Sequence, residues 1–293
     1  QLAVEIRRLV SEGECRYRDI QVLTKDMLLY GNLLKPIFQE MAIPFYLDEE
    51  QLMENHPLIE WINSLFALDR YAYRLSDIMR FFKTELLIAP ENQELEQEQW
   101  QWIRDDFRKK LDLTENVALA YNYQGNYWTR AKDWTFVSYN FETEELEDVQ
   151  ELQEQSNEIR RLFQSNIPGF FKKIKNCENG QEAASVFYQF LVTSGVRQQL
   201  LFWRNQEVAR GNLAQARNHE QTWGALIDLL DEFALIYGET SFEWETFQDI
   251  ISSGLENLSY GKIPTAIDQV QVNRLELVRP NQAKITFALG LND

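Results

Sequence analysis

Short strand-like segments stand near both ends of this chain, and a long stretch of helical pattern separates them. Residues 19–24 and 268–272 alternate between apolar and polar side chains, and 43–47 and 283–289 also have the pattern of strands. Neither terminal segment is long enough to bury its own strands, so we expect all four to share one sheet. The sequence therefore predicts an α/β fold, mostly helical, in which a large helical insertion interrupts a parallel-sheet domain.

Two segments beside the N-terminal strands have the apolar spacing of helices: residues 1–13 and the residues from Asp26 to about Ala42. The resulting order of helix, strand, helix and strand is typical of a parallel sheet. We expect the second helix to begin after Asp26, which can cap its first turn, and to run to about Ala42. The residues that define its apolar face in this interpretation are Leu29, Leu33, Ile37 and Met41.

The middle of the chain is predicted to be helical. A helix starts at Pro57, which suits the first turn, and from about residue 90 to 262 the pattern is almost only helical. Residues 127–140 are an exception and predict an irregular loop or a short strand. Three breaks are expected to separate helices: Pro168-Gly169, Gly211 and Gly238.

Composition limits the class of protein. An apolar share of 44% is ample for a buried core, and no apolar run approaches the roughly 18 residues that a membrane span needs. The two cysteines, Cys15 and Cys177, fit no ligand spacing and suit a reducing cytosol. We therefore expect a cytoplasmic protein. The chain begins at Gln1 inside an apparent helix and stops after a strand-like run, so we also expect a piece of something longer.

No motif for phosphoryl transfer or metal binding is found in the sequence. It has no GxxxxGK[ST] loop and no Gly-rich dinucleotide fingerprint. The two histidines, His56 and His219, belong to no metal pattern, and for both a capping or packing role is the favoured interpretation. We predict no catalytic residue, no metal ligand and no bound cofactor in this stretch.

Lys25 is the candidate for a nucleotide contact. It follows the strand at 19–24, and open α/β sheets place ligand-binding groups at the carboxyl ends of their strands. The simpler interpretation is a solvated lysine in a loop.

Local clusters of cations and aromatic residues are the candidates for DNA binding. The net charge of −17 opposes a polyanion over the whole surface, so any contact must be local. The cations that we name are Lys172, Lys173 and Lys175, beside Phe170 and Phe171, and Arg197 and Arg204, near Phe202 and Trp203. In the alternative interpretation the aromatic rings are core, and the cations solvate its rim.

The chain also carries a series of short motifs. Toward the N-terminus they are YRDIQVLTK at 17–25, IPFYLD at 43–48, HPLIE at 56–60 and FKTEL at 82–86. Toward the C-terminus they are ARNHEQTW at 216–223, IPTAIDQVQV at 263–272 and LGLND at 289–293. In order and spacing these motifs resemble the AddB/RexB family of bacterial AddAB/RexAB helicase–nucleases, over essentially the whole chain.

The resemblance implies a fold and a parent function. Residues 1–88 and 263–293 are expected to form the second RecA-like domain of a UvrD/RecB-type helicase, and 89–262 its helical insertion. The parent would be an ATP-dependent helicase/deoxyribonuclease subunit, a 5′–3′ exonuclease, that processes DNA double-strand breaks for recombinational repair. Its expected partners are an AddA/RexA-type subunit, in a heterodimer, and DNA as single strands and duplex ends. Its ATP/Mg and iron–sulfur cluster are expected outside this stretch.

Two departures from active helicases limit what this stretch is expected to do. Lys25 stands in the place of the motif IV arginine, and a lysine lacks the bidentate fork of a guanidinium. Residues 272–275 stand in the place of motif V, without its His and Gly. We therefore predict a DNA-tracking or hotspot-recognition scaffold without an active site of its own. The alternatives are a fragment of an active UvrD-type motor and a protein-binding helical scaffold.

Overall fold

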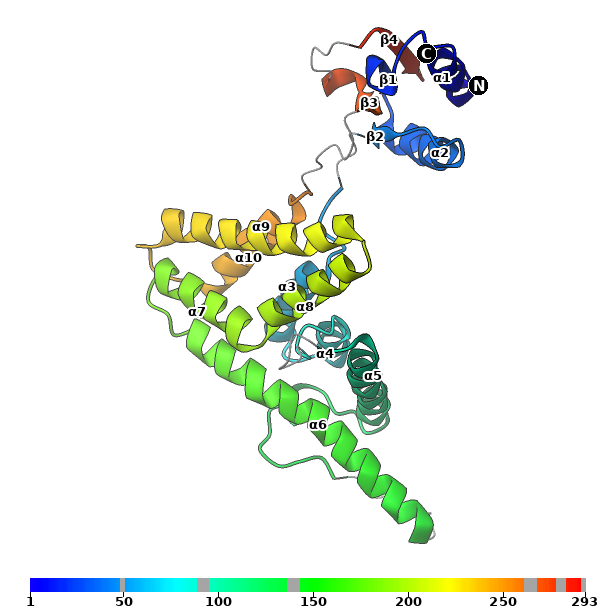
Figure 1. Cartoon of the computed structure of the whole chain (residues 1–293). Coiled ribbons are helices and arrows are strands. Elements are labelled where there is room, and N and C mark those ends of the chain that lie inside the picture. Colours follow the sequence, from blue (N-terminus) through cyan, green and yellow to red (C-terminus); the bar gives the residue numbers. More distant parts are fainter. Residues whose placement is uncertain (48–50, 89–94, 136–142, 261–267, 278–282, 291–293) are drawn as a thin grey trace. The chain divides into compact units, whose positions relative to one another are not determined.

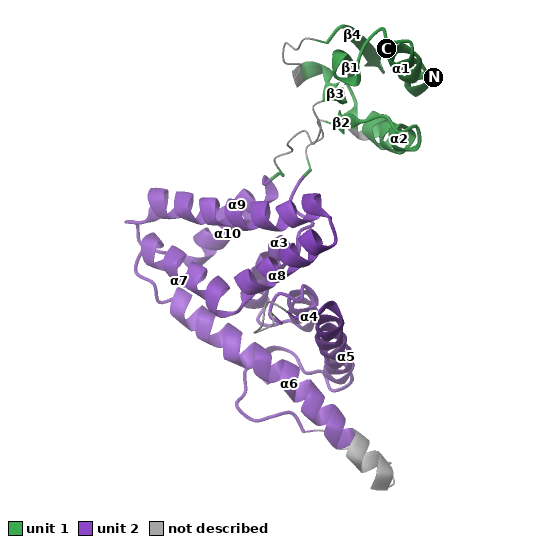
Figure 2. Cartoon of the chain, in the orientation of Figure 1, with its two compact units in different colours: residues 1–51, 259–293 green, residues 52–258 purple. Residues whose placement is uncertain are grey.

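A computed structural model describes residues 1–47, 51–88, 95–135, 143–260, 268–277 and 283–290 of the chain. It divides into two compact units. Residues 1–51 and 259–293 form the first, which we call the sheet unit, and residues 52–258 form the second, the helical unit (Figure 2). Each unit is described by itself.

The sheet unit takes its strands from both ends of the chain (Figure 1). Its described elements are α1 (Leu2–Ser11), η1 (Tyr17–Asp19), β1 (Ile20–Thr24), α2 (Met27–Glu40), β2 (Phe45–Leu47), β3 (Val270–Arg274), η3 (Leu275–Leu277) and β4 (Ile285–Leu289). The four strands form one sheet in the order β2-β3-β1-β4, and every neighbouring pair is parallel. The prediction that all four strands share one sheet is confirmed, and so is the α/β class; the RecA-like assignment stays a prediction.

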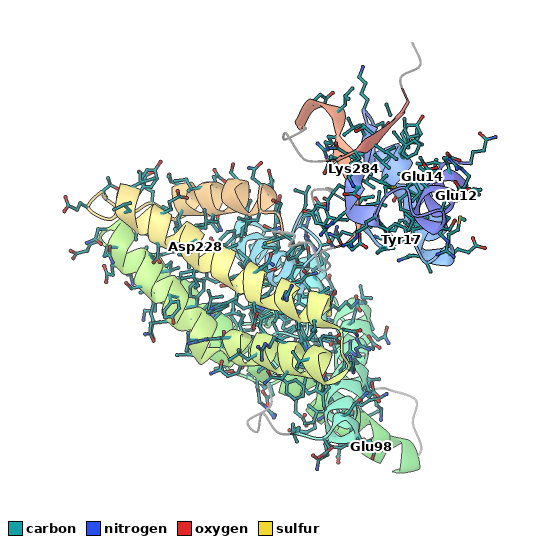
Figure 3. The ribbon with its side chains drawn as sticks, turned by 45° about the horizontal axis from the view of Figure 1, so that its top comes forward. Glu12, Glu14, Tyr17, Glu98, Asp228 and Lys284 are labelled. Carbon is teal, nitrogen blue, oxygen red and sulfur yellow. The ribbon has the colours of Figure 1, made fainter. Side chains whose placement is uncertain are left out.

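Alternation along β1 decides which side of the sheet α1 and α2 cover. Ile20 and Val22 are fully buried and belong to one apolar cluster with Ile6 of α1 and Phe38 of α2. At the start of β4, Lys284 (labelled in Figure 3) donates from its backbone N–H to the Asp19 carbonyl at 2.7 Å, and its Nζ lies 3.0 Å from Asp19 Oδ2. Both contacts tie the C-terminal strand to the residue before β1.

Helix α2 begins as predicted but turns a different face to the core. The Asp26 carboxylate accepts from the Leu29 backbone N–H at 2.8 Å, so the predicted cap is confirmed. The predicted apolar face is wrong as a buried face. Leu29, Leu33 and Ile37 are 55%, 53% and 42% exposed. Among its described side chains the helix buries Met27, Leu34 and Phe38, while Met41, the fourth residue of the predicted face, is partly buried against the same cluster.

The helical unit contains eight described α-helices. They are α3 (Pro57–Arg70), α4 (Leu75–Lys83), α5 (Gln97–Ala120), α6 (Thr143–Ile174), α7 (Gly180–Thr193), α8 (Val196–Ala209), α9 (Leu213–Tyr237) and α10 (Trp244–Glu256), with the short η2 (Gly125–Tyr127) after α5. Aromatic rings dominate its core. Phe187 and Phe247 are fully buried with ring centroids 5.4 Å apart, and Phe170 stacks on Phe190 at 4.1 Å.

Two local features differ from the sequence-based expectations. Residues 52–88, which we placed with the sheet, lie in the helical unit, because α3 packs against α4 and α10, and α4 packs against α5. The predicted break at Pro168-Gly169 is wrong, since α6 continues through it to Ile174. A proline inside a helix costs about 3 kcal/mol. The buried side chains of Ile167, Phe171 and Ile174 on the same helix offset that cost.

Candidate functional site

The carboxyl edge of the sheet holds the predicted nucleotide-contacting residue. Lys25 directly follows the last residue of β1 and is exposed. In the parallel register Thr24 lies opposite Arg274, the last residue of β3, so the two strands end side by side. The fold thus brings two cations, Lys25 and Arg274, to the edge where α/β sheets bind ligands.

These two cations line one open pocket of about 610 Å³. Tyr30 of α2 and Gly290, which follows β4, line it as well. Gly290 has φ +68°, and a Cβ there would lie 2.7 Å from the Tyr30 ring, so the position requires glycine for both reasons. Asp26 and Glu276 line it too, so the two cations face two acidic side chains, and the lining carries no net charge that would favour an anion. No motif or spacing in the sequence points to Arg274 as a binding residue. It becomes a candidate because the parallel register of β1 and β3 places it beside the end of β1.

Lys172 and Lys173, predicted to bind DNA, are exposed near the end of α6. The rings beside them are not available to a ligand, because Phe170 and Phe171 are each only 4% exposed. Lys173 also lines a pocket of about 550 Å³ between α6 and α7. Here the rings are core and the lysines solvate its rim, which is the alternative interpretation stated above.

Arg197 and Arg204, the other predicted DNA contacts, lie on α8 with partners of their own. Arg197 is exposed, and its guanidinium carbon lies 6.0 Å from the Trp223 ring centroid. Arg204 pairs with Glu220 at 2.7 Å, which neutralises its charge. Phe202 is buried, and Lys175, the remaining predicted cation, pairs with Asp69 at 2.6 Å.

The two histidines form a buried pair although they lie 163 positions apart in the chain. The Leu58 backbone N–H donates to His56 Nδ1 at 3.1 Å, so the predicted capping role of His56 is confirmed. His56 Nε2 therefore carries the proton and donates to His219 Nδ1 at 2.9 Å. Burial, followed by the neighbouring His219, lowers the pKa of His56 to about 3. Both rings are neutral and act as structural groups.

A cleft of about 840 Å³ in the helical unit holds a charged cluster that the sequence did not reveal. Glu85 is only 6% exposed and has φ +60°. Its carboxylate accepts from Arg104 Nε at 2.7 Å and from Arg108 Nε. In the sequence, only the i, i+4 spacing of the two arginines on α5 indicates that they share a helix face. That spacing does not point to residue 85 as their partner. The cluster carries one net positive charge and can bind an anion.

Two features are absent from the described part of the chain: a cluster of metal-ligating side chains and a helix that could span a membrane. Within the described ranges, no three His, Cys, Asp or Glu side chains converge as metal ligands. Among the same residues, no helix is long and apolar enough to cross a membrane. Cys15 and Cys177 are both buried, and burial raises the pKa of each thiol.

The fold class is therefore a mostly helical α/β protein whose small parallel sheet comes from both ends of the chain. Over its whole length the chain is 52% identical to the B subunit of the ATP-dependent helicase/deoxyribonuclease of Enterococcus faecalis. It is 36% identical to the corresponding protein of Latilactobacillus sakei, and 33% identical to that of Anoxybacillus flavithermus, each along the full chain. The chain spans about a quarter of the length of these relatives. No family model matches it.

The chain is thus homologous, from end to end, to a part of the B subunit of ATP-dependent helicase/deoxyribonucleases. The resemblance to the AddB/RexB family that the motifs indicated is confirmed.

Proposed function

We propose that this chain is the helicase-like, DNA-contacting scaffold of an AddB/RexB-type protein and not its motor. The observation that carries the proposal is the similarity along the entire chain to relatives whose name joins a helicase to a deoxyribonuclease. The discontinuous parallel sheet supports it, because a RecA-like domain interrupted by a helical insertion has that order of elements. DNA tracking, or recognition of a hotspot sequence, is the role that we assign to this stretch.

The scaffold role rests on what stands at the carboxyl edge of the sheet. Lys25 places a single ammonium charge there, and it lacks the planar guanidinium that can donate two hydrogen bonds to one phosphate. Phosphoryl transfer also needs a phosphate-binding loop, and the sequence has none. We therefore propose that Lys25 at most steadies a bound nucleotide, while ATP and Mg act elsewhere in the parent protein.

The cellular setting belongs to the same proposal. We place the parent in the cytoplasm, in a heterodimer with an AddA/RexA-type subunit, where it processes double-strand breaks for recombinational repair. Its substrates would be duplex ends and single-stranded DNA. The 5′–3′ exonuclease and an iron–sulfur cluster would be supplied by parts of the parent outside this stretch.

The active-motor alternative is kept because Arg274 stands beside Lys25 in one pocket. The two roles separate in the reconstituted two-subunit complex. We expect the Lys25→Ala and Arg274→Ala variants to hydrolyse ATP and unwind DNA within about twofold of the unchanged complex, as expected for groups outside the phosphoryl-transfer machinery. A loss of about a hundredfold or more in the ATP turnover number, with Lys284→Ala unaffected, would identify this edge as a motor site and refute the scaffold role.

A further inference from the structure

Residues 121–135 follow α5 (Figure 1), and buried polar side chains of α6 hold them in place. Arg160, fully buried, donates to the backbone carbonyls of Tyr127 and Arg130 and pairs with Asp133. Asn157 accepts from the Trp134 backbone N–H at 2.8 Å and donates to the Trp134 carbonyl at 3.0 Å. A long irregular segment fixed by so many buried hydrogen bonds is pre-organised, and loops of this kind usually carry a function.

The same loop presents a stack of aromatic rings that ends in a guanidinium. Tyr123 stacks on Tyr127 with centroids 5.0 Å apart and planes 27° apart. The Arg130 guanidinium carbon lies 4.1 Å from the Tyr127 ring centroid. Tyr127 is 38% exposed and Arg130 is exposed, so the stack reaches the surface.

A second stack of the same kind lies on the loop between α3 and α4. The Arg74 guanidinium carbon lies 4.4 Å from the Tyr71 ring centroid, and Tyr71 is 52% exposed. Asp77, buried behind it, accepts from Arg74 Nε at 2.9 Å and from Nη2 at 3.0 Å, which fixes the guanidinium plane. The Gly125 N–H donates to the Tyr73 carbonyl at 3.0 Å and thereby joins the two loops. Two exposed arginine-on-tyrosine stacks are thus part of one surface.

The local charge of this surface is opposite to that of the chain. Its two loops, 71–74 and 121–135, contain three cations, Arg74, Arg130 and Lys132, and one acid, Asp133, in a chain of net charge −17. Arg74 is paired with Asp77 of α4, so the unpaired positive charge comes from Arg130 and Lys132. Asp133 is already paired with Arg160 and Arg161. Within the described residues Arg130 and Lys132 make no ion pair. The loops therefore combine planar stacking groups with unneutralised positive charge.

We infer that this surface, the paired-loop platform, binds single-stranded nucleic acid. Bases stack on guanidinium planes and aromatic rings regardless of sequence, while cations follow the phosphates. In each stack the arginine covers the tyrosine and offers its outer plane to a base, and Lys132 adds a phosphate contact. The inference deepens the proposed DNA-contacting role and rests on it, and it moves the contact away from Lys172, Lys173, Arg197 and Arg204.

The test uses the whole 293-residue chain and a fluorescein-labelled oligothymidylate of about 15 nucleotides, the length that such grooves cover. Arg130→Ala and Tyr127→Ala should each weaken binding roughly 5- to 100-fold, the range for loss of one stacking group. Arg130→Lys keeps the positive charge but removes the planar guanidinium on which a base can stack. It should weaken binding of the base-bearing strand and leave the salt slope and the binding of an abasic strand unchanged. Arg70→Ala removes a cation of similar exposure, which pairs with Asp249, and should have no effect.

The alternative outcomes separate this inference from the proposed function. If Arg130→Ala binds like the unchanged chain while loss of Lys172 and Lys173 weakens binding, the DNA role stands and the platform is refuted. If the unchanged chain binds no strand even at low salt, the proposed function fails together with the platform. If Arg130→Ala leaves strand binding intact but abolishes co-purification with the partner subunit, the platform is a protein contact and the inference is wrong.

Discussion

The two units treat their apolar side chains differently. In the helical unit many large rings form the core, and Phe187, Phe202 and Phe247 have at most 2% of their surface exposed. In the sheet unit α2 buries Met27 and Phe38 but leaves Leu29, Leu33 and Ile37 largely exposed. The helical unit exposes large apolar side chains as well, among them Trp102, Leu119 and Leu235 at 70%, 65% and 84%. In the sheet unit the exposed residues Leu29, Leu33 and Ile37 form a strip at i, i+4 and i+8 on one helix.

The units also differ in how they use buried polar groups. The helical unit encloses the Arg160 network, the two histidines and the Glu85 carboxylate, each with its partners. Among the described residues, buried atoms without a hydrogen-bond partner occur in both units: the amide nitrogens of Gln21 and Gln269 in the sheet unit, and Trp61 Nε1, Ser156 Oγ and both amide atoms of Gln199 in the helical unit. Networks of satisfied polar groups favour one arrangement of a core. The satisfied networks therefore indicate that the specificity of the helical fold depends in part on particular polar side chains.

The sharpest way to test this contrast is to truncate two neighbouring leucines of α2. Leu34 is 6% exposed and Leu33 is 53% exposed. Leu34→Ala should lower the free energy of unfolding of the sheet unit by about 2–5 kcal/mol, because it removes buried methyl groups and leaves a cavity. Leu33→Ala should change it by less than about 0.5 kcal/mol. Urea denaturation measures both, and equal losses would mean that the Leu33 face is buried as well as the Leu34 face.

In the helical unit the comparable test is a buried arginine. Arg160→Met removes three hydrogen bonds to the 121–135 loop and should lower the free energy of unfolding by about 2–4 kcal/mol. Arg161→Met is the matched control. The Arg161 side-chain surface is 44% exposed, and its pairs with Asp133 and Glu154 are worth about 1 kcal/mol or less in water. Similar denaturation midpoints for the two variants would show that the loop does not depend on the buried network.

The histidine pair predicts how the helical unit responds to acid. The folded pKa of His56 lies well below the ordinary value of about 6.5, so its contribution to stability is complete above that pH and is lost as the pH falls toward about 3. At pH 5 the loss from His56 is about 2 kcal/mol. Burial lowers the pKa of His219 in the same direction. His56→Asn keeps a capping acceptor for Leu58, and denaturation midpoints between pH 7 and 5 should fall less in this variant than in the unchanged chain. If the midpoints of the variant and of the unchanged chain fell equally between pH 7 and 5, the lowered pKa of His56 would be contradicted.

The pattern of apolar residues was sufficient to predict the sheet, and insufficient to predict which face of α2 is buried. Alternating apolar and polar residues near both chain ends predict four strands. Because neither end can bury its own strands, we expect the four strands to pair in one sheet. On α2, however, two apolar stripes run side by side, and Leu33 and Leu34 belong to different ones. Only packing against α1 and β1 decides between them. Local periodicity carries no information about that choice.

The candidate sites show the same limit. Lys25 was found from its place after a strand, a local signal, but Arg274 joins it only through the parallel register. Glu85 meets Arg104 and Arg108 because α4 packs against α5, and no spacing in the sequence encodes that contact. The paired-loop platform is formed by loops some 50 positions apart, joined at Tyr73 and Gly125. Long-range sites of this kind become visible only when the packing of the helices is known.

The smallest expected effect separates the two units most directly. Asp26 caps α2 in the sheet unit, and the Asn179 side chain caps α7 in the helical unit by accepting from the Glu182 N–H at 2.9 Å. Each Asp26→Ala or Asn179→Ala change should cost about 1 kcal/mol, since one helix-terminal N–H loses its acceptor. Because each unit has its own core, each change should shift the unfolding of its own unit alone. Hydrogen exchange of β1 amides reports on the sheet unit, and that of α9 amides reports on the helical unit. If either cap change accelerated exchange equally in β1 and α9, the two units would unfold together. They would then differ in composition but would not be independently stable.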